Sequence, residues 1–254
     1  MNLEITGYKD KHEYISDKGI RSVVYLMDCM EGLKQIPEKY FQLAIVDPPY
    51  GINAPNMQMG SAPNRKGKNQ YPGESTAVKV RKGRLNQGSG KLKNRALNTM
   101  NCEWDNAIPT AEYFSLLSTV SINRVIWGGN YFPLPPTRCV VVWDKCQPWE
   151  NFSQVEIAWT SFDKPASLFQ YSNTGGLNAE KKIHPTQKPI KLYEWLITKY
   201  YTGGGILDTH LGSGSSRIAC CKASIPFMGF ELDPDYFNAS VKRFKDFVAQ
   251  GKLF

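Results

Sequence analysis

Asp47-Pro48-Pro49-Tyr50 follows directly on an apolar run at residues 41–46, and its residue types could bind a flat ring that carries an amine. At the end of a buried strand, the Asp47 carboxylate can accept hydrogen bonds. Pro49 restricts Pro48 to extended conformations, so the Pro48 carbonyl is held beside that carboxylate. Two adjacent acceptors can take both hydrogens of one exocyclic amine, and Tyr50 offers an aromatic face for stacking. A proline-rich turn with Asp47 as a local acceptor is the structural alternative.

A second candidate site lies near the C-terminus, where a glycine loop, Gly212-Ser213-Gly214, separates a predicted strand from a predicted helix. Glycines let the backbone approach a ligand, and the helix start offers free N–H groups. Glu231 follows 19 residues after Gly212 at the end of the next strand, where a carboxylate can accept both hydroxyls of a ribose. Arg217 occupies the third glycine position of a dinucleotide fingerprint, and no P-loop is present. The pattern favours a ribose-bearing cofactor other than a dinucleotide; a purely structural glycine turn is the alternative.

Together, Asp-Pro-Pro-Tyr-Gly at 47–51, Ile-His-Pro-Thr-Gln-Lys-Pro at 183–189 and the glycine loop resemble the amino-group DNA methyltransferases that use S-adenosylmethionine. The catalytic motif comes first and the cofactor loop last, which resembles the permuted β class. The resemblance covers about residues 21 to 245, apart from a basic insert. It implies that the amine nitrogen of a flipped base attacks the methyl group directly, without a covalent enzyme intermediate. The implied catalytic residues are Asp47, Pro48, Pro49 and Tyr50.

The same resemblance implies a set of cofactor-binding residues. Asp208 and the glycine loop would surround the methionine part, Glu231 the ribose and Asp28 the adenine amine, while the 186–188 segment would contact the carboxylate end. The full set is Asp28, Thr186, Gln187, Lys188, Asp208, His210, Gly212, Ser213, Gly214, Ser215 and Glu231. Thr209 and His210 depart from the usual Asp-Pro-Phe-x-Gly-Ser-Gly-Thr pattern, which bears on cofactor affinity. Two roles stay open: His184 could orient its loop or be structural, and Asn130 could line the base pocket or sit in a turn.

Alternating apolar segments predict the elements that must hold these residues. They predict one domain over 1–254 with a mostly parallel sheet, one antiparallel strand pair and helices on both faces. The resemblance identifies this as a Rossmann-like class I methyltransferase fold with circularly permuted motifs. Strands are expected at 23–28, 41–47, 124–127, 204–208 and 227–232, with the antiparallel pair at 139–143 and 155–160. Helices are expected at 30–39, 110–123, 191–201, 215–223 and 234–247.

The formal charge of +8 is concentrated in one segment. Ten basic residues and a single acid, Glu74, lie between 65 and 95. They belong to a polar insert at 51–103 that has too few apolar residues to supply a core, and so long a loop is usually functional or mobile. Asn and Gln lie among these cations, which suits base edges and phosphates, although a solvated, flexible face is the plainer interpretation. We expect the insert to contact DNA through Arg65, Lys66, Lys68, Lys79, Arg81, Lys82, Arg84, Lys91, Lys93 and Arg95. Residues 163–182 form only a short candidate target-recognition segment.

Composition excludes other classes of protein. No window approaches eighteen unbroken apolar residues, which excludes a membrane-spanning helix. The N-terminus has no basic segment before an apolar core, which argues against a secretory signal and for a cytoplasmic protein. The six cysteines form no C-x-x-C pair, so we expect reduced thiols and no metal site. Double-stranded DNA is the expected partner. Many members of the family that the chain resembles form dimers, so a homodimer is possible. The sequence indicates neither the recognition sequence nor a cognate nuclease.

Several alternatives remain at this level. Asp47 as the first motif residue favours methylation of adenine N6, whereas Ser is the common form for cytosine N4. An RNA adenine methyltransferase would use the same pocket. A non-catalytic module that binds nucleic acid is disfavoured because the Asp47–Tyr50 motif is intact, and Arg217 disfavours a dehydrogenase.

Overall fold

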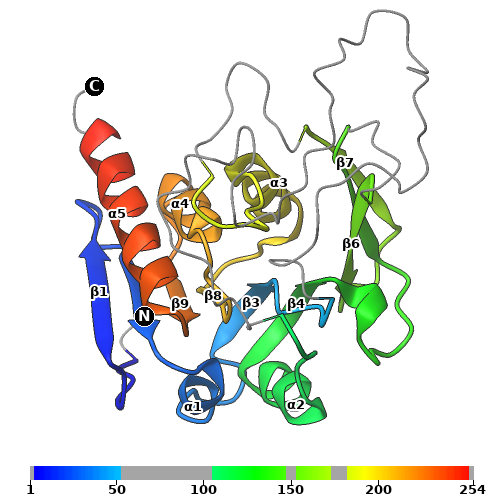
Figure 1. The fold of residues 1–254 in the computed structure, drawn as a ribbon, viewed down its shortest axis with the longest axis horizontal. Helices are drawn as coiled ribbons and strands as arrows, with labels where there is room; N and C mark the ends of the chain where they lie inside the picture. Colours follow the sequence, from blue (N-terminus) through cyan, green and yellow to red (C-terminus); the bar gives the residue numbers. More distant parts are fainter. Residues whose placement is uncertain (1–2, 53–104, 147–152, 173–181, 252–254) are drawn as a thin grey trace, which may run out of the picture.

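A computed structural model of the chain describes residues 3–52, 105–146, 153–172 and 182–251. The described residues form a nine-stranded sheet of order β1-β2-β9-β8-β3-β4-β6-β5-β7 (Figure 1). The strands are β1 (Asp10–Ile15), β2 (Arg21–Leu26), β3 (Phe41–Val46), β4 (Ser121–Trp127), β5 (Val140–Asp144), β6 (Val155–Thr160), β7 (Ser167–Gln170), β8 (Ile206–Asp208) and β9 (Phe227–Glu231). The central strands β2, β9, β8, β3 and β4 run parallel, and every residue of β2 is buried. Burial on both faces explains the unbroken apolar runs of these strands.

The predicted mostly parallel fold is confirmed, including the antiparallel pairing of β5 with β6. Two further antiparallel pairings, β4 with β6 and β1 with β2, were not predicted. Neither were the edge strands β1 and β7 themselves. The sequence of β1, Asp-Lys-His-Glu-Tyr-Ile, is largely charged and exposed, and β7 has four residues. Apolar periodicity therefore does not mark either strand.

Five helices of the described residues cover both faces of the sheet (Figure 1). Leu33 of α1 (Cys29–Leu33) and Leu117 of α2 (Ala111–Val120) belong to the core on one face. The other core contains Leu196 of α3 (Ile190–Tyr200), Ala219 of α4 (Ser215–Lys222) and Phe237 of α5 (Pro234–Gly251). No helix of the described residues is long and apolar enough to cross a membrane.

Three helix ends were predicted wrongly, and the helix expected over 234–247 continues to Gly251. The helix expected over 30–39 ends at Leu33, and Gly32 lies against Phe230, whose Cε1 would be 2.5 Å from a Cβ atom there. The helix expected over 110–123 ends at Val120, and β4 begins at the next residue because Ser121 pairs in register with Phe41. Pairing with β3 thus overrides the local helical pattern.

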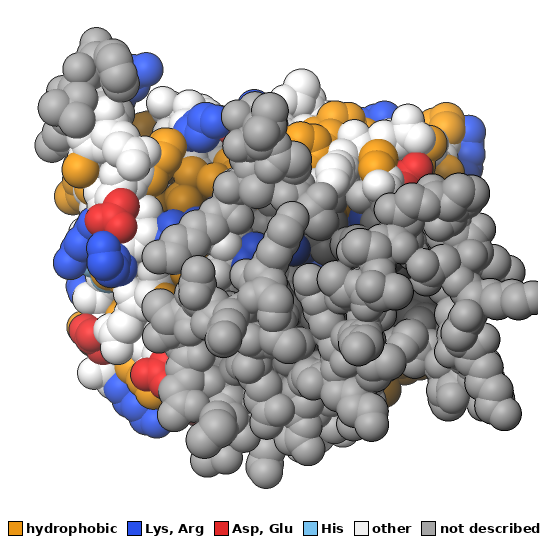
Figure 2. Space-filling model, turned by 45° about the horizontal axis from the view of Figure 1, so that its top comes forward, with side chains coloured by type: hydrophobic (Ala, Val, Ile, Leu, Met, Phe, Trp, Pro, Cys, Tyr) orange, Lys and Arg blue, Asp and Glu red, His pale blue; other side chains and the backbone are white. Residues whose placement is uncertain are grey.

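The basic insert cannot be compared with this fold, because residues 53–104 and all ten of its predicted DNA-contacting cations lie outside the described residues. The candidate target-recognition segment is described up to residue 172 and contains β7. In Figure 2 the Lys and Arg side chains of the described surface lie in small groups, several beside acidic side chains. Among the ion pairs of the described residues are Lys34 with Glu31 and Lys242 with Asp246.

Candidate functional site

The two sequence motifs meet at the carboxyl edge of the sheet. β3 and β8 are parallel neighbours, with Leu43 paired to Ile206 and Ala44 to Leu207. The turn after β3 and the loop after β8 therefore emerge side by side, where ligands bind in sheets of this kind. A cavity of about 500 Å³ lies there. Ten predicted site residues line it: Asp28, Asp47, Pro49, Thr186, Gln187, Lys188, His210, Gly212, Ser213 and Glu231.

The other predicted residues lie just behind the cavity wall. Pro48, Asp208, Gly214 and Ser215 are buried, and Tyr50 is partly buried. Residues that the sequence motifs missed also line the cavity: Met27, Cys29, Tyr193, Thr209, Leu211, Leu232, Asp233, Pro234 and Tyr236. Leu232 to Pro234 follow Glu231 directly, so the strand-end argument could have included them. Tyr193 and Tyr236 project from helices and carry no local signal.

The glycine loop needs its glycines and is tied to Glu231. Gly212 has φ 50° and Gly214 φ 71°, in the left-handed region that favours glycine. The Gly212 N–H donates to Oε2 of Glu231 at 2.7 Å, while the N–H groups of Leu232 and Asp233 donate to Oε1 at 3.0 Å. Burial raises the pKa of Glu231 to about 7 despite these donors. Glu231 is thus an oriented acceptor at the end of β9.

Thr209 and His210, which depart from the family pattern, are held by hydrogen bonds. The hydroxyls of Tyr113 and Thr209 lie 2.7 Å apart, and Thr209 Oγ1 lies 2.9 Å from Nδ1 of His210. Burial lowers the pKa of His210 to about 4, so the ring is neutral at pH 7. A row of hydrogen-bonded side chains, Tyr113, Thr209 and His210, therefore forms this part of the site, and the last two line the cavity.

Asp208 lies beneath that chain and is only 2% exposed. Its carboxylate accepts hydrogen bonds from the Ser216 hydroxyl at 2.5 Å and the His210 N–H at 3.1 Å. Burial raises its pKa to about 7. Asp208 therefore fixes the loop after β8 from within, whereas Asp28 is exposed and caps α1 through the Met30 N–H at 2.9 Å.

Asp47 is held from two sides. The Tyr50 hydroxyl donates to its Oδ1 at 2.6 Å, and Lys188 Nζ lies 2.5 Å from its Oδ2. The same ammonium lies 3.0 Å from Glu156 Oε2 and 3.1 Å from the Tyr50 hydroxyl. Lys188 was expected at the carboxylate end of a cofactor, but its contacts here are with the catalytic turn. No sequence motif indicated Glu156.

The Tyr50 ring is fixed at the turn. It stacks on Tyr131 with centroids 5.0 Å apart and planes at 15°. It also packs on Gly128, where a Cβ atom would lie 2.2 Å from Tyr50 Cε1. Asn130, a tentative base-pocket residue by sequence, is exposed beside this stack. A base that stacks on Tyr50 must therefore use the part of the Tyr50 ring that Tyr131 and Gly128 leave uncovered.

The backbone of the turn is held by Asp105, which follows the insert. Oδ1 of the buried Asp105 accepts from the N–H groups of Tyr50 and Gly51 at 2.6 and 2.9 Å. The first residue after the undescribed 53–104 segment thus contacts the catalytic turn. Gly51 and Asp105, the described residues near the two ends of that segment, are thus hydrogen-bonded to each other at the candidate site.

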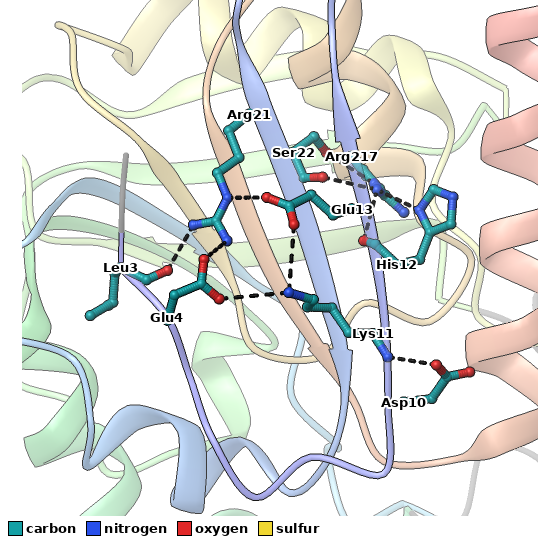
Figure 3. A network of polar contacts seen from close by, with 9 residues as sticks. All are labelled: Leu3, Glu4, Asp10, Lys11, His12, Glu13, Arg21, Ser22 and Arg217. Carbon is teal, nitrogen blue, oxygen red and sulfur yellow. Dashed lines mark hydrogen bonds and ion pairs between the residues drawn. The ribbon is translucent and has the colours of Figure 1, made fainter.

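Arg217 replaces the third glycine of a dinucleotide fingerprint for a structural reason. Its guanidinium lies over the Phe244 ring at 3.9 Å, with Nε donating to Ser22 Oγ at 3.0 Å. Nη2 donates to His12 Nδ1 at 2.9 Å, which anchors the edge strand β1 (Figure 3). This side chain braces α4 against β1, β2 and α5.

Comparisons with known proteins show what the chain is similar to. Residues 141–242 match the family described as DNA methylase, a segment that contains Lys188, the glycine loop and Glu231 but not Asp47. The type II methyltransferase M.HpaI of Haemophilus parainfluenzae is 31% identical over 80 residues. That match covers 31% of this chain and 26% of the relative, so it spans about a quarter of that protein.

Solved structures show similarity over most of the chain. The PvuII DNA methyltransferase, which is cytosine-N4-specific, has a TM-score of 0.52 and 17% identity, covering 89% of this chain and 90% of that one. The M1.HpyAVI complex with SAM has a TM-score of 0.49 and 19% identity, covering 87% and 98%. The likeness to the PvuII enzyme shows that this chain has the class I methyltransferase fold.

Proposed function

We propose that the chain is a site-specific DNA methyltransferase that transfers a methyl group from S-adenosylmethionine to the N6 amine of a flipped adenine. The observation that carries this proposal is the meeting of Asp47 with the glycine loop and Glu231 around one cavity of about 500 Å³. An amine acceptor and a ribose acceptor that line one cavity suit a group transfer between a base and a nucleoside cofactor. The DNA methylase match over 141–242 supports the same reading.

The cavity fits S-adenosylmethionine by the chemistry of its donors and acceptors. Glu231 would accept the ribose hydroxyls, the glycine loop would approach the methionine part, and Asp28 would receive the adenine amine. His184 and Tyr236 form a tilted ring pair on the wall, with centroids 4.3 Å apart. When bound, the cofactor would supply an electrophilic methyl group. The motif order, with β3 before β8, supports assignment to the permuted β class.

The protein's own residues would act mainly by positioning. Asp47 and the Pro48 carbonyl would accept the two amine hydrogens and so direct the nitrogen lone pair towards the methyl group. The Tyr50 ring would hold the base plane. The bound cofactor would supply the methyl group and be left as a neutral thioether, and the amine nitrogen that gains the methyl group would release one proton to water. No covalent bond to the protein is required.

Adenine is favoured over cytosine because a carboxylate begins the motif. Methylation of cytosine N4 is the second candidate, since the PvuII enzyme of the same fold is cytosine-N4-specific. Both bases present an exocyclic amine to the same two acceptors. An RNA adenine methyltransferase would fit the pocket equally but has no observation in its favour.

The basic insert would supply much of the DNA contact. Asp105, which follows the segment, binds the N–H groups of Tyr50 and Gly51, so the described residues that flank the segment lie at the catalytic turn. Cations at 65–95 would neutralise phosphates, and flipping a base costs a few kcal/mol that such contacts must offset. Double-stranded DNA is therefore the proposed partner.

The decisive experiment incubates the purified chain with unmethylated genomic DNA and isotopically labelled S-adenosylmethionine. The DNA is digested to nucleosides, which are separated and weighed. We expect labelled N6-methyldeoxyadenosine, and an Asp47→Ala variant that keeps its circular dichroism spectrum but loses transfer. N4-methyldeoxycytidine would establish the second candidate. Label only in a matched RNA, or none in either nucleic acid, would refute the proposal.

A further inference from the structure

Four buried or partly buried charged side chains alternate in sign across the floor of the candidate site. Lys145 Nζ lies 2.7 Å from Glu156 Oε1, whose Oε2 lies 3.0 Å from Lys188 Nζ. Lys188 in turn lies 2.5 Å from Asp47 Oδ2. They come from the end of β5, from β6, from the loop before α3 and from the end of β3. Four separate segments thus contribute to one row of alternating charges that ends at Asp47.

These charges are held away from water. The side chains of Lys188, Lys145, Asp47 and Glu156 are 2, 11, 19 and 22% exposed. Desolvating charges is unfavourable, and well-packed apolar residues often stabilise a fold as well or better. The Lys188 ammonium lies within 3.1 Å of Asp47, Glu156 and the Tyr50 hydroxyl, but the buried Glu156 Oε2 has no hydrogen-bond partner among the described residues. An arrangement of this cost points to a role beyond stability.

We propose that Lys188 and Glu156 are positioning residues for methyl transfer: Lys188 keeps Asp47 ionised and oriented, and Glu156 holds Lys188 in place. This inference rests on the proposed function and deepens it. Protonation would turn one Asp47 oxygen into a donor, so only the carboxylate can accept from Tyr50, Lys188 and the substrate amine together. With Tyr50 on Oδ1 and Lys188 on Oδ2, the carboxylate has one orientation.

The electrostatics give the two residues opposite effects on Asp47. Burial raises the pKa of Asp47, Lys188 lowers it and Glu156 raises it. Despite burial, Lys188 and Lys145 lower the pKa of Glu156 to about 2, so Glu156 is ionised throughout the working range. The other titratable groups that face Asp47 are Tyr50, Tyr113, Tyr193 and Asp208. All of these remain in either variant.

Lys188→Met should therefore raise the pKa of Asp47, while Glu156→Gln should lower it. The pKa is read from the ¹³C carboxyl signal of labelled aspartate, assigned by its absence in Asp47→Asn. Methyl transfer is measured from pH 5 to 9 in parallel. We expect Lys188→Met to move the acid limb of kcat/KM upwards and Glu156→Gln to reduce kcat about tenfold with the cofactor Kd unchanged. Lys242→Met, which removes an exposed lysine paired with Asp246, is the matched control.

The outcomes separate the two proposals. Opposite shifts in the two variants support the inference, since simple loosening of the fold would move the signal in one direction. An active wild type whose Asp47 signal moves in neither variant, or equally in both, overturns the inference and leaves the proposed function standing. A wild type inactive on DNA overturns both. If Lys188→Met fails to fold, Glu156→Gln alone still decides, because an unchanged or raised Asp47 pKa contradicts the proposal.

Discussion

The Gly212 N–H donates to Oε2 of Glu231 at 2.7 Å, so the glycine loop and the acid at the end of β9 form one unit. Two further backbone N–H groups bind the other carboxylate oxygen. The acid is therefore oriented before any ligand arrives, and its ionisation governs what it can accept. This relationship makes cofactor binding sensitive to pH.

We expect the Kd for S-adenosylmethionine to fall about tenfold between pH 6 and pH 8, because Glu231, with its pKa raised to about 7 by burial, becomes ionised over that interval. Glu231→Gln should bind about 10–100-fold more weakly at pH 8 and with little pH dependence. Isothermal titration calorimetry measures both. Asp163→Asn is the control, since it removes an exposed carboxylate that pairs with Arg138 and does not line the cavity. A Glu231→Gln variant that keeps the wild-type slope would contradict this role.

Gly128→Ala should abolish methyl transfer while cofactor affinity stays within a few-fold of wild type. Its Cβ atom would lie 2.2 Å from Tyr50 Cε1, so the ring must leave its position. We expect a loss of about 2–3 kcal/mol in unfolding free energy, from the left-handed φ of 72° together with the clash. Gly19→Ala has the same φ but nothing within 4 Å, and isolates the backbone term. Equal effects of both substitutions on activity would show that the Tyr50 ring position is unimportant.

The sequence predicts best where one local pattern carries the information. Asp47 and Glu231 end buried parallel strands, and the shared edge of the sheet brings them together without further knowledge. Glu156 lies within β6, in an alternating pattern typical of a half-buried strand, and nothing nearby indicates its partner. Lys188 was placed by motif, but its contacts depend on two strands far away in sequence. These contacts and the start of β4 depend on pairing between distant segments. Local periodicity does not predict such pairing.

Lowering the pH should destabilise the fold through His12. Burial and the nearby Arg217 lower the pKa of His12 to about 4, so the folded state binds fewer protons than the unfolded one. Stability is therefore lost as the pH falls from about 6.5 towards 4, by about 1–2 kcal/mol for this partly exposed ring. His12→Asn, which keeps an acceptor for Arg217 Nη2, should flatten that slope in urea unfolding curves. An unchanged slope would assign the acid sensitivity to other groups.

Deletion of residues 62–93 should abolish DNA affinity while leaving cofactor binding intact. The deleted segment carries nine of the ten cations between 65 and 95, so most phosphate contacts should disappear. If roughly six cations meet phosphates, log affinity of the wild type should fall against log salt with a slope near −5. Fluorescence anisotropy with a labelled duplex measures both quantities. Bridging the cut with a Gly-Ser linker preserves the Asp105 contact to the turn; undiminished DNA binding by this variant would exclude the insert as the DNA contact.

Tyr50→Phe separates the ring of Tyr50 from its hydroxyl. The ring can keep its stack on Tyr131, whereas Asp47 loses the donor on Oδ1 and Lys188 loses one of its three acceptors. We expect kcat to fall about tenfold, because one buried hydrogen bond that orients Asp47 contributes about 1–2 kcal/mol. The Kd for cofactor and the flipping signal of a 2-aminopurine duplex should stay near wild type, since the ring remains in place. Tyr131→Phe, which removes a hydroxyl from the other ring of the stack, is the matched control. Full activity of Tyr50→Phe would mean that Lys188 alone orients the Asp47 carboxylate.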